Sequence, residues 1–304
     1  MVGGVLLHEA WELTPERVID MIGAGSFRLR RTGQMLFVAF LVAIVAFAGT
    51  PSPLAQGLAA GGTIVAFAHG ARVYGSGIVV FLAVSLVVTF ALENLSITTG
   101  FPFGHYHFEV AAGLPHIGAV PIVVGLLYFA MGYFSWMIAS LLLDDADIHM
   151  DRALNVVALP LIAAFVMVQW DVVMDPPNAT LYRAWIWHDG GGYFGVPLSN
   201  YVGWYLTVWL FYQAFALFVY FRPSSVRPRP HGSWLPPVLV YLAVALSYAV
   251  PYLIGHDGEV DVTGHGWRAQ DLRETTMVVM LFTMLFTSAL ALLRWAARRA
   301  GAAS

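Results

Sequence analysis

Three carboxyl groups set in long apolar stretches are the residues of this chain best suited to chemistry. Asp171 and Asp175 close one apolar run, and Glu93 closes another. A spacing of four places the two aspartates on one face of a helix, which Pro176 and Pro177 are expected to end. Ionisable groups inside membrane segments are costly and mark sites or pathways. Taken singly, each is equally consistent with a helix end in contact with water.

Carboxyl groups that face hydrocarbon favour acid–base chemistry. Because the charged form is disfavoured there, a carboxylic acid can remain a proton donor near neutral pH. Repulsion between two carboxylates on neighbouring turns would keep one protonated and leave the other ionised, free to orient and deprotonate a water molecule. We therefore predict Asp171 and Asp175 as an acid and its ionised partner, with Glu93 as the alternative base.

Aromatic residues gather in the loops that follow these acids. The segment 100–106 is rich in Gly, Pro and Phe, which is typical of a shaped turn that can act as a lid. Aromatic faces attract a cation by about 0.5–2 kcal/mol and do not readily react with it. The residues predicted to bind a substrate are Thr99, Phe101, Phe103, Tyr106, Trp170, Trp185, Trp187, Tyr193, Phe194 and Asn200. Taken one at a time, the aromatic residues are more typical of a belt at the membrane interface.

Histidines in the first of these loops raise the alternative of a metal site. His105, His107 and Glu109 alternate along a segment that would face one way if extended, and His116 lies nearby. No helix with a His-x-x-x-His pattern accompanies them, so we predict no metal and no cofactor, and leave open whether the His105/His107 segment binds a metal. The polar run 256–265 is predicted to be a solvated loop.

Composition identifies the solvent of the chain as lipid. Of 304 residues, 59% are hydrophobic and 11% are charged, against about 25% charged in an ordinary soluble domain. All fifteen basic residues are arginine, which excludes a Schiff-base lysine of the kind that a retinal-binding protein needs. The absence of cysteine excludes disulfides, thiolate metal sites and a cysteine nucleophile. The net charge of −3 identifies no partner, and no nucleic acid is expected.

The apolar runs predict an all-α, polytopic transmembrane bundle of about eight spans. The predicted spans are residues 32–50, 54–72, 76–93, 117–142, 153–174, 200–221, 234–254 and 275–296. They form one domain, 32–296, between an amphipathic N-terminal lead-in, 1–31, and a C-terminal tail, 297–304. The lead-in mixes acidic residues and arginines with apolar positions, unlike a signal peptide.

The arginine distribution predicts the orientation of the spans. With eight spans and both termini in the cytoplasm, eleven arginines lie on the inner side and three on the outer side, leaving Arg17 aside. This arrangement places the long loops 93–116, 171–199 and 255–274 together on the outer face of a cytoplasmic (inner) membrane. Chemistry is therefore expected toward that face.

The loop motifs are long and unusual. They comprise Glu93 with the run 99–104 and Tyr106, then 120–121, then Asp171, Asp175 and Pro176, then Trp185 and Trp187, then 193–200 and 203–204. Over residues 90–205 the chain resembles the bacterioruberin-type (CruF-like) carotenoid hydratases. The resemblance implies a membrane enzyme without an organic cofactor that hydrates the terminal isopropylidene double bond of an acyclic carotenoid to a tertiary alcohol. Its expected partners are the carotenoid, water, the lipid bilayer and other carotenoid biosynthesis enzymes.

Two other functions remain open from the sequence. A cyclase or isomerase of the carotenoid end group would also begin with protonation but would exclude water. A non-catalytic carotenoid or lipid carrier would use the aromatic loops to bind an end group, and its acids would be interfacial. The identity of the carotenoid, the number of ends that react, the choice of acid and the oligomeric state stay open at this point.

Overall fold

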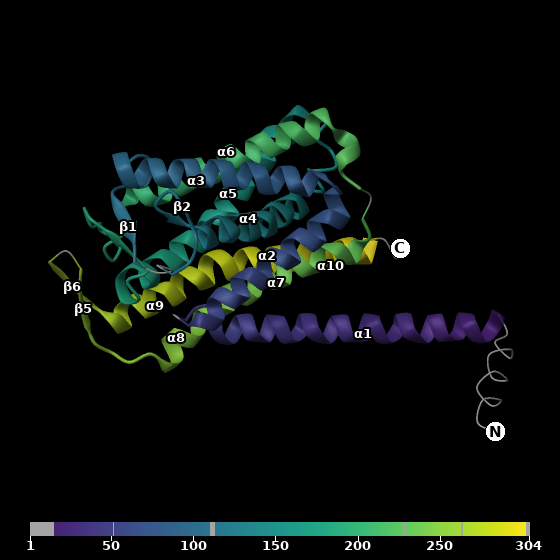
Figure 1. The fold of residues 1–304 in the computed structure, drawn as a ribbon, viewed down its shortest axis with the longest axis horizontal. Helices are drawn as coiled ribbons and strands as arrows, with labels where there is room; N and C mark the ends of the chain where they lie inside the picture. The colour runs from purple at the N-terminus through teal and green to yellow at the C-terminus, as the bar shows by residue number, and fades with distance from the viewer. Residues whose placement is uncertain (1–14, 51, 110–112, 228, 263, 302–304) are drawn as a thin grey trace, which may run out of the picture. The chain divides into compact units, whose positions relative to one another are not determined.

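The computed structural model describes residues 15–50, 52–109, 113–227, 229–262 and 264–301 (Figure 1). Residues 1–14 of the predicted lead-in lie outside the described residues, and the remainder forms the start of helix α1, Pro15–Phe47. The chain divides into two compact units, Met1–Val42 and Ala43–Ser304. The features described below belong to the second unit.

Each of the eight predicted apolar runs is mostly helical. After α1 follow α2 Pro53–Tyr74, α3 Gly77–Thr99, α4 Ile122–Leu142, α5 Ala153–Pro176, α6 Leu198–Phe221, α7 Leu235–Ser247, α8 Ala249–Ile254, α9 Ala269–Met280 and α10 Phe286–Gly301, with π-helical turns Pro177–Leu181 and Leu281–Leu285 and 3-10 turns Pro223–Ser225 and His231–Trp234. Among the described residues, six segments are long and apolar enough to cross a membrane, namely 77–99, 122–142, 153–181, 198–221, 232–254 and 269–298. The prediction of a helical bundle with several membrane-length helices is confirmed. The number eight stays a prediction, because the runs 32–50 and 54–72 are not among these six.

Helix α4 lies at the centre of the second unit, in contact with α2, α3, α5, α7 and α10. It is the most buried of the six segments, since 72% of its apolar 18-residue stretch lies inside the molecule. Its glycines allow close packing, since a Cβ at Gly125 would lie 2.6 Å from the ring of Phe90 on α3. At Gly132 it would lie 3.1 Å from the ring of Phe211 on α6. Side chains on α4 therefore face neighbours on most sides.

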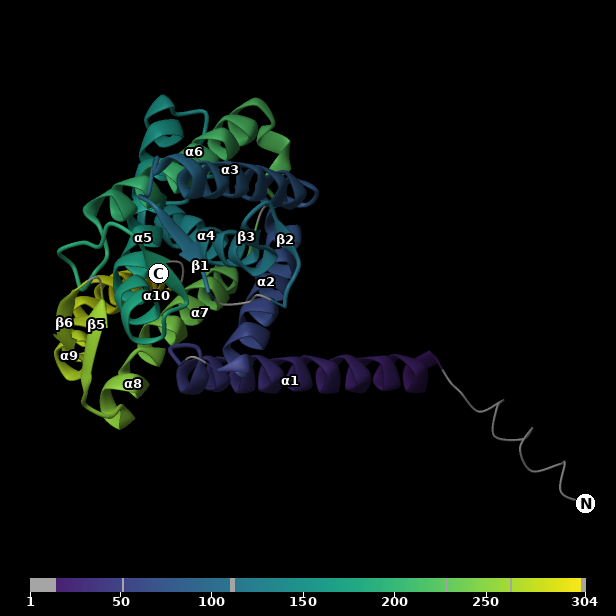
Figure 2. The ribbon, with the colours of Figure 1, turned by 60° about the vertical axis from the view of Figure 1, so that its left-hand side comes forward.

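Three short antiparallel strand pairs cover one end of the bundle. Strand β1, Tyr106–Phe108, pairs with β4, Trp185–Trp187, although they belong to different loops. Strands β2, His116–Ile117, and β3, Val120–Pro121, form a hairpin, and so do β5, Glu259–Val262, and β6, His265–Arg268. In Figures 1 and 2, β1 and the β5–β6 hairpin lie at the same end of the bundle. Side chains from the predicted outer loops therefore meet there.

The β2–β3 hairpin occupies the first residues of the predicted span 117–142. Its turn is fixed by Asn94 on α3, whose side chain donates to the carbonyl of Ile117 at 3.0 Å and accepts from the amide of Ala119 at 2.8 Å. Gly118 has a φ of 64°, a conformation that favours glycine. Helix α4 therefore begins later than predicted, at Ile122.

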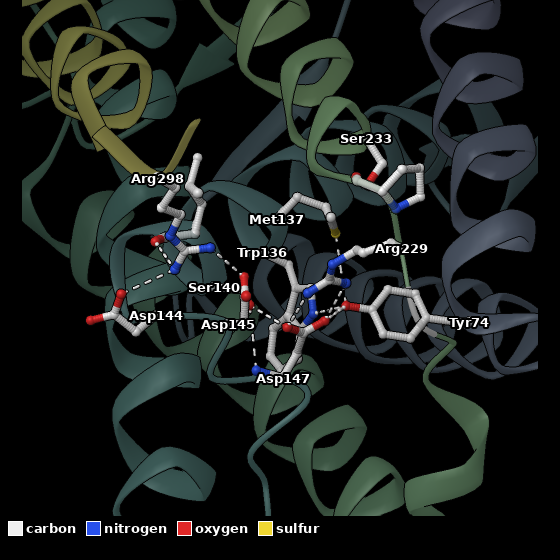
Figure 3. Close-up of polar contacts among 12 residues, drawn as sticks. Tyr74, Trp136, Met137, Ser140, Asp144, Asp145, Asp147, Arg229, Ser233 and Arg298 are labelled. Carbon is white, nitrogen blue, oxygen red and sulfur yellow. Dashed lines mark hydrogen bonds and ion pairs between the residues drawn. The ribbon is translucent and has the colours of Figure 1, made fainter. Parts of the chain in front are cut away.

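A buried ion pair ties together the connections at the other end of the helices (Figure 3). Arg229, which precedes α7, donates two hydrogen bonds to the carboxylate of Asp147 in the α4–α5 connection, at 2.7 and 2.5 Å. Tyr74 at the end of α2 donates a third, at 2.5 Å, and Ser140 donates a fourth. The guanidinium also lies over the ring of Trp234, 3.9 Å from its centroid. We call these five residues the Asp147 cluster.

The two charged residues of the Asp147 cluster, Asp147 and Arg229, form an ion pair with each other. Burial opposes the charge of Asp147, but the attraction of Arg229 and four hydrogen bonds outweigh it, so the pKa of Asp147 lies below its ordinary value. Burial likewise opposes the charge of Arg229, yet Asp147 raises the pKa of Arg229 above its usual value. Beside the cluster, Arg298 pairs with Asp145 at 2.6 Å and with Asp144 at 3.1 Å (Figure 3). At this end of the bundle, Asp147, Arg229, Asp145 and Arg298 are therefore all in ion pairs.

Candidate functional site

The two aspartates predicted as an acid and its partner lie one turn apart on α5, and both are buried. The α-helix ends at the proline pair, as predicted. Helix α5 includes Pro176 and continues into the π-helical turn Pro177–Leu181. The carbonyl of Val172, which has no backbone donor at Pro176, accepts a hydrogen bond from the hydroxyl of Tyr193 at 3.4 Å. Asp175 thus lies inside a continuous helical segment, away from a frayed helix end.

Asn200, at the start of α6, bridges the two aspartates. Its side-chain nitrogen donates to Oδ2 of Asp175 at 2.6 Å and to Oδ2 of Asp171 at 3.1 Å. The indole nitrogen of Trp185 on β4 donates to the other oxygen of Asp175 at 2.6 Å. Oδ1 of Asp171 is buried without a hydrogen-bond partner among the described residues. The two carboxyl groups are therefore unequal, since both oxygens of Asp175 are satisfied and one oxygen of Asp171 is not.

Glu93 lies near the end of α3, which continues to Thr99, and its side chain is buried. Tyr128 on α4 donates to one carboxylate oxygen at 2.7 Å, and Tyr106 on β1 donates to the other. Burial and the nearby carboxylate raise the pKa of Tyr106 well above its ordinary value, so its hydroxyl stays a donor. Glu93 is close enough to Asp171 and Asp175 to interact with both electrostatically. None of the three carboxyl groups forms an ion pair within the described part of the chain.

The pairing of β1 with β4 sets the aromatic residues against these acids. Tyr106 is opposite Trp187, and Phe108 is opposite Trp185. Alternate residues of a strand share a face, so these four rings lie on the same side of the two-stranded ribbon. The ring centroids of Tyr106 and Trp187 are 4.8 Å apart. The ribbon therefore places four aromatic rings on one of its faces, and two of them, Tyr106 and Trp185, donate hydrogen bonds to the acids.

The turn before β1 is fixed by hydroxyl groups from two helices. Ser96 on α3 accepts from the amide of Phe103 at 3.1 Å and donates to the carbonyl of Gly104 at 2.8 Å. Ser199 on α6 donates to the carbonyl of Phe103 at 2.7 Å. At Gly203 a Cβ would lie 2.8 Å from the carbonyl oxygen of Pro102, so only glycine lets the turn approach α6 this closely. Phe103 is held in the core by these contacts.

All three carboxyl groups line one cavity of about 550 Å³, bounded by α2, α4, α5, α6, α7 and the β1–β4 ribbon. Ligand sites usually enclose about 300–1,000 Å³. One part of the lining is polar and comes from the α1–α2 connection and the loops: Thr50, Ser52, Gln56, Glu109, Asn178 and Arg183. Another part is apolar and comes from α2, α4 and α7: Leu58, Ala59, Gly62, Val124, Leu127, Met131, Phe134, Val240 and Val244. The acids lie on the wall of a cavity with a polar and an apolar part.

Six of the ten predicted substrate-binding residues line this cavity, namely Phe103, Tyr106, Trp170, Trp185, Trp187 and Asn200. The other four do not. Phe101 is 58% exposed, and the hydroxyl of Thr99 donates to the carbonyl of Leu95 on its own helix. Tyr193 and Phe194 pack against each other, and the ring of Phe194 lies 5.0 Å from that of Trp267 on β6. A role for these four in substrate binding stays a prediction.

The cavity also contains residues that sequence reasoning did not select. Tyr128 stacks on Trp204 of α6 with ring centroids 4.1 Å apart and an angle of 15°. Trp170 donates to the hydroxyl of Tyr248 at 3.2 Å and meets Trp204 edge-on. The sequence contains a signal for these residues, because a tyrosine or tryptophan inside an apolar run carries an O–H or N–H group that needs a hydrogen-bond partner when it is buried.

The loop histidines lie outside the cavity. His105 contacts Asp189 at 3.1 Å, and His107 contacts Glu109 at 2.9 Å and His188 at 2.7 Å. In the part of the chain that the structure describes, no group of three or more His, Asp or Glu side chains has an arrangement that could hold a metal ion. These contacts instead tie the β1–β4 ribbon to the segment that follows it.

Comparison with known proteins assigns the family. The chain is 28% identical over 119 residues to bisanhydrobacterioruberin hydratase of Haloarcula japonica, a match that covers 39% of this chain and 38% of that relative. No solved structure matches the chain. The family model described as carotenoid biosynthesis protein matches residues 55–264, which contain the three carboxyl groups, Asn200 and the β1–β4 ribbon. This chain therefore belongs to the carotenoid biosynthesis protein family.

Proposed function

We propose that this protein adds water to the terminal isopropylidene double bond of an acyclic carotenoid end group, a 1′,2′-hydration that yields a tertiary alcohol. The observation that carries the proposal is the buried Asp171–Asn200–Asp175 arrangement on the wall of an aromatic-lined cavity. Family membership and the hydratase activity in the relative's name support it.

In this proposal Asp171 is the acid. A buried carboxylate oxygen without a hydrogen-bond partner is costly when charged, and a protonated carboxyl group costs less. Asp171 would transfer its proton to the less substituted alkene carbon, and the alkene's π electrons would form the new C–H bond. The neighbouring carbon becomes a tertiary cation.

Asp175 is the ionised partner. Trp185 and Asn200 donate to its two oxygens, and such hydrogen bonds stabilise a carboxylate. A water molecule would attack the cation through its oxygen, and Asp175 would take the proton that this oxygen loses. Passage of a proton from Asp175 to Asp171, one turn away, restores the starting state and leaves a net addition of water. Glu93, held by Tyr106 and Tyr128, is the alternative base.

Aromatic rings would shelter the cation between its formation and capture. Trp170, Trp187 and Trp204 line the cavity beside the acids. The face of an indole ring attracts a cation by about 0.5–2 kcal/mol and forms no bond with it, unlike a carboxylate. Water would enter through the polar part of the cavity, near Glu109 and Arg183.

An oxygen-label experiment tests the proposal. Purified protein is incubated without molecular oxygen, with an acyclic carotenoid, in water enriched in heavy oxygen. We expect a tertiary alcohol that carries the label and one solvent-derived hydrogen on the adjacent carbon. An isomer of unchanged mass would identify a cyclase or isomerase, and unchanged pigment from folded protein, across several acyclic carotenoids, would identify a carrier.

We further propose eight spans with both termini in the cytoplasm of an inner-membrane protein, which places the cavity's polar part on the outer face. The chain lacks cysteine, so single cysteines can be introduced at the exposed positions Gly113, Gly258 and Ser224. An impermeant thiol reagent added to intact cells should label the first two and spare Ser224→Cys. The reverse pattern would invert the orientation.

A further inference from the structure

We propose that the apolar part of the cavity is a separate subsite for the isoprenoid chain behind the reacting end group, and that Gly62 on α2 sets how bulky that chain can be. This inference rests on the proposed function. It concerns a region of the cavity wall apart from the acids, formed by α2, α4 and α7.

The helix α2 presents its smallest residues to this region. Ala55, Ala59 and Gly62 all line the cavity, and their spacing of four and three places them on one face of the helix. Gly62 is buried, yet a Cβ built on it would meet no atom within 4 Å. A buried backbone with open space beside it is the wall of a cavity, in contrast to the tight packing at Gly125, where a Cβ would be 2.6 Å from Phe90.

The rest of this region of the wall is apolar. It is built from Leu127, Met131 and Phe134 on α4 and Val240 and Val244 on α7. Phe134 is fully buried, and the ring of Tyr133 packs edge-on against it with centroids 6.0 Å apart. No charged group lines this part of the cavity in the described structure, so it offers only dispersion contacts and suits a hydrocarbon.

The acids indicate which class of hydrocarbon could both bind in the apolar part and react. A saturated lipid acyl chain would fill the apolar part equally well but would bring nothing for the unpartnered oxygen of Asp171 to act on. A methyl-branched isoprenoid with a terminal double bond can place its chain against α2 and its alkene at Asp171. The cavity is thus divided between a reacting end and a binding end.

Filling the space beside Gly62 tests this division. Gly62→Phe would occupy the apolar part, and we expect the Kd for an acyclic C40 carotenoid, measured from its absorption shift and from quenching of tryptophan fluorescence, to rise by about 5- to 150-fold. Hydration of a ten-carbon isoprenoid alcohol with the same terminal double bond, whose chain is too short to fill the subsite, should fall less than hydration of the carotenoid does. Gly57→Phe is the matched control, because Gly57 lies on the same helix, is exposed, has open space and does not line the cavity.

The outcomes separate this inference from the proposed function. Carotenoid binding by Gly62→Phe equal to that of Gly57→Phe, with both folded, would overturn the subsite. Loss of co-purifying phospholipid from Gly62→Phe with an unchanged carotenoid Kd would assign the space to a membrane lipid instead. If the unmodified protein hydrates neither substrate, the proposed function fails, and the binding measurement still decides the subsite. Ala59→Leu provides a second, smaller filling of the same wall should Gly62→Phe not fold.

Discussion

Among the residues that the structure describes, buried carboxyl groups lie in two regions, and the hydrogen-bond partners of these groups differ in charge between the two. In the Asp147 cluster, a guanidinium, a phenol and a hydroxyl saturate one carboxylate, and none of the five cluster residues lines the cavity that contains the other acids. In the cavity, Glu93, Asp171 and Asp175 have only neutral donors, and one oxygen has none. The first arrangement fixes the protonation state of its acid, whereas the second leaves protons free to move. Burial alone therefore does not distinguish a structural acid from a reactive one, but the charge of the partners does.

The largest expected effect is on turnover. Asp171→Asn removes the proposed proton donor while keeping the size of the side chain, and we expect product formation per folded molecule to fall by about 10²- to 10⁴-fold. Asp147→Asn is the matched control, because it removes a buried carboxylate from the other region and should leave turnover per folded molecule unchanged. Pigment mass analysis measures both variants. Near-normal product from both Asp171→Asn and Asp175→Asn would move the acid to Glu93.

The next effect is on stability and concerns the other region. Arg229→Met leaves Asp147 buried without its cation, which typically costs about 3–5 kcal/mol of unfolding free energy. The double variant with Asp147→Asn should recover part of that loss, since no unpaired charge then remains. Reversible unfolding in detergent micelles, followed by circular dichroism, gives the values. If Asp171→Asn destabilises the protein as much as Arg229→Met does, the contrast between the regions is wrong.

A smaller effect is expected from the donors to Glu93. Tyr128→Phe removes one hydroxyl and leaves a buried acceptor with fewer partners, which costs about 1–3 kcal/mol. We expect about a tenfold fall in turnover, and the same from Tyr106→Phe. Because both hydroxyls serve one carboxylate, the double variant should deviate from additivity. Additive and negligible effects on turnover would remove Glu93 from the site.

The smallest expected effect is that of pH, near neutrality, on the part of the unfolding free energy that comes from the Asp147 cluster. The pKa of Asp147 is lowered in the folded protein, so its contribution to stability is present above the ordinary aspartate pKa of about 3.9 and is lost as pH falls through the lower folded value. The contribution of this group should therefore be fully present, and independent of pH, between about pH 5 and 8. Asp147→Asn should remove the acid-side loss. An Asp147-dependent change in stability between pH 5 and 8 would contradict this assignment.

The sequence identified the cavity acids because ionisable residues are rare in apolar runs and their cost signals a purpose. Six of the ten residues predicted to bind a substrate line the same cavity, and their role in binding stays a prediction. The sequence could not say which way each side chain of a turn points, so Phe101 was grouped with Phe103 although one is exposed and the other is buried. Tyr128 is not among the predicted site residues, because a tyrosine in an apolar helix is equally consistent with a side chain that only packs in the core.

Other features needed contacts that no local pattern contains. Asp147 and Arg229 are 82 residues apart, and neither stands out from its polar connection. The π-helical turn that continues from α5 beyond the proline pair is another example, because the proline rule alone predicts only that the α-helix ends there. Helix boundaries were accordingly less well predicted than helix existence.

One wall of the cavity is made of strand and the others of helix, and this difference bears on the timing of turnover. The β1–β4 ribbon has only three residue pairs in register, yet it supplies Tyr106 to Glu93 and Trp185 to Asp175. Lifting so short a ribbon costs far less than separating packed helices, and it withdraws a donor from each of these two carboxylates at the same moment. Opening of the ribbon would therefore break a hydrogen bond of Glu93 and one of Asp175 in a single motion, so that these two acids keep their arrangement only while the ribbon is in place.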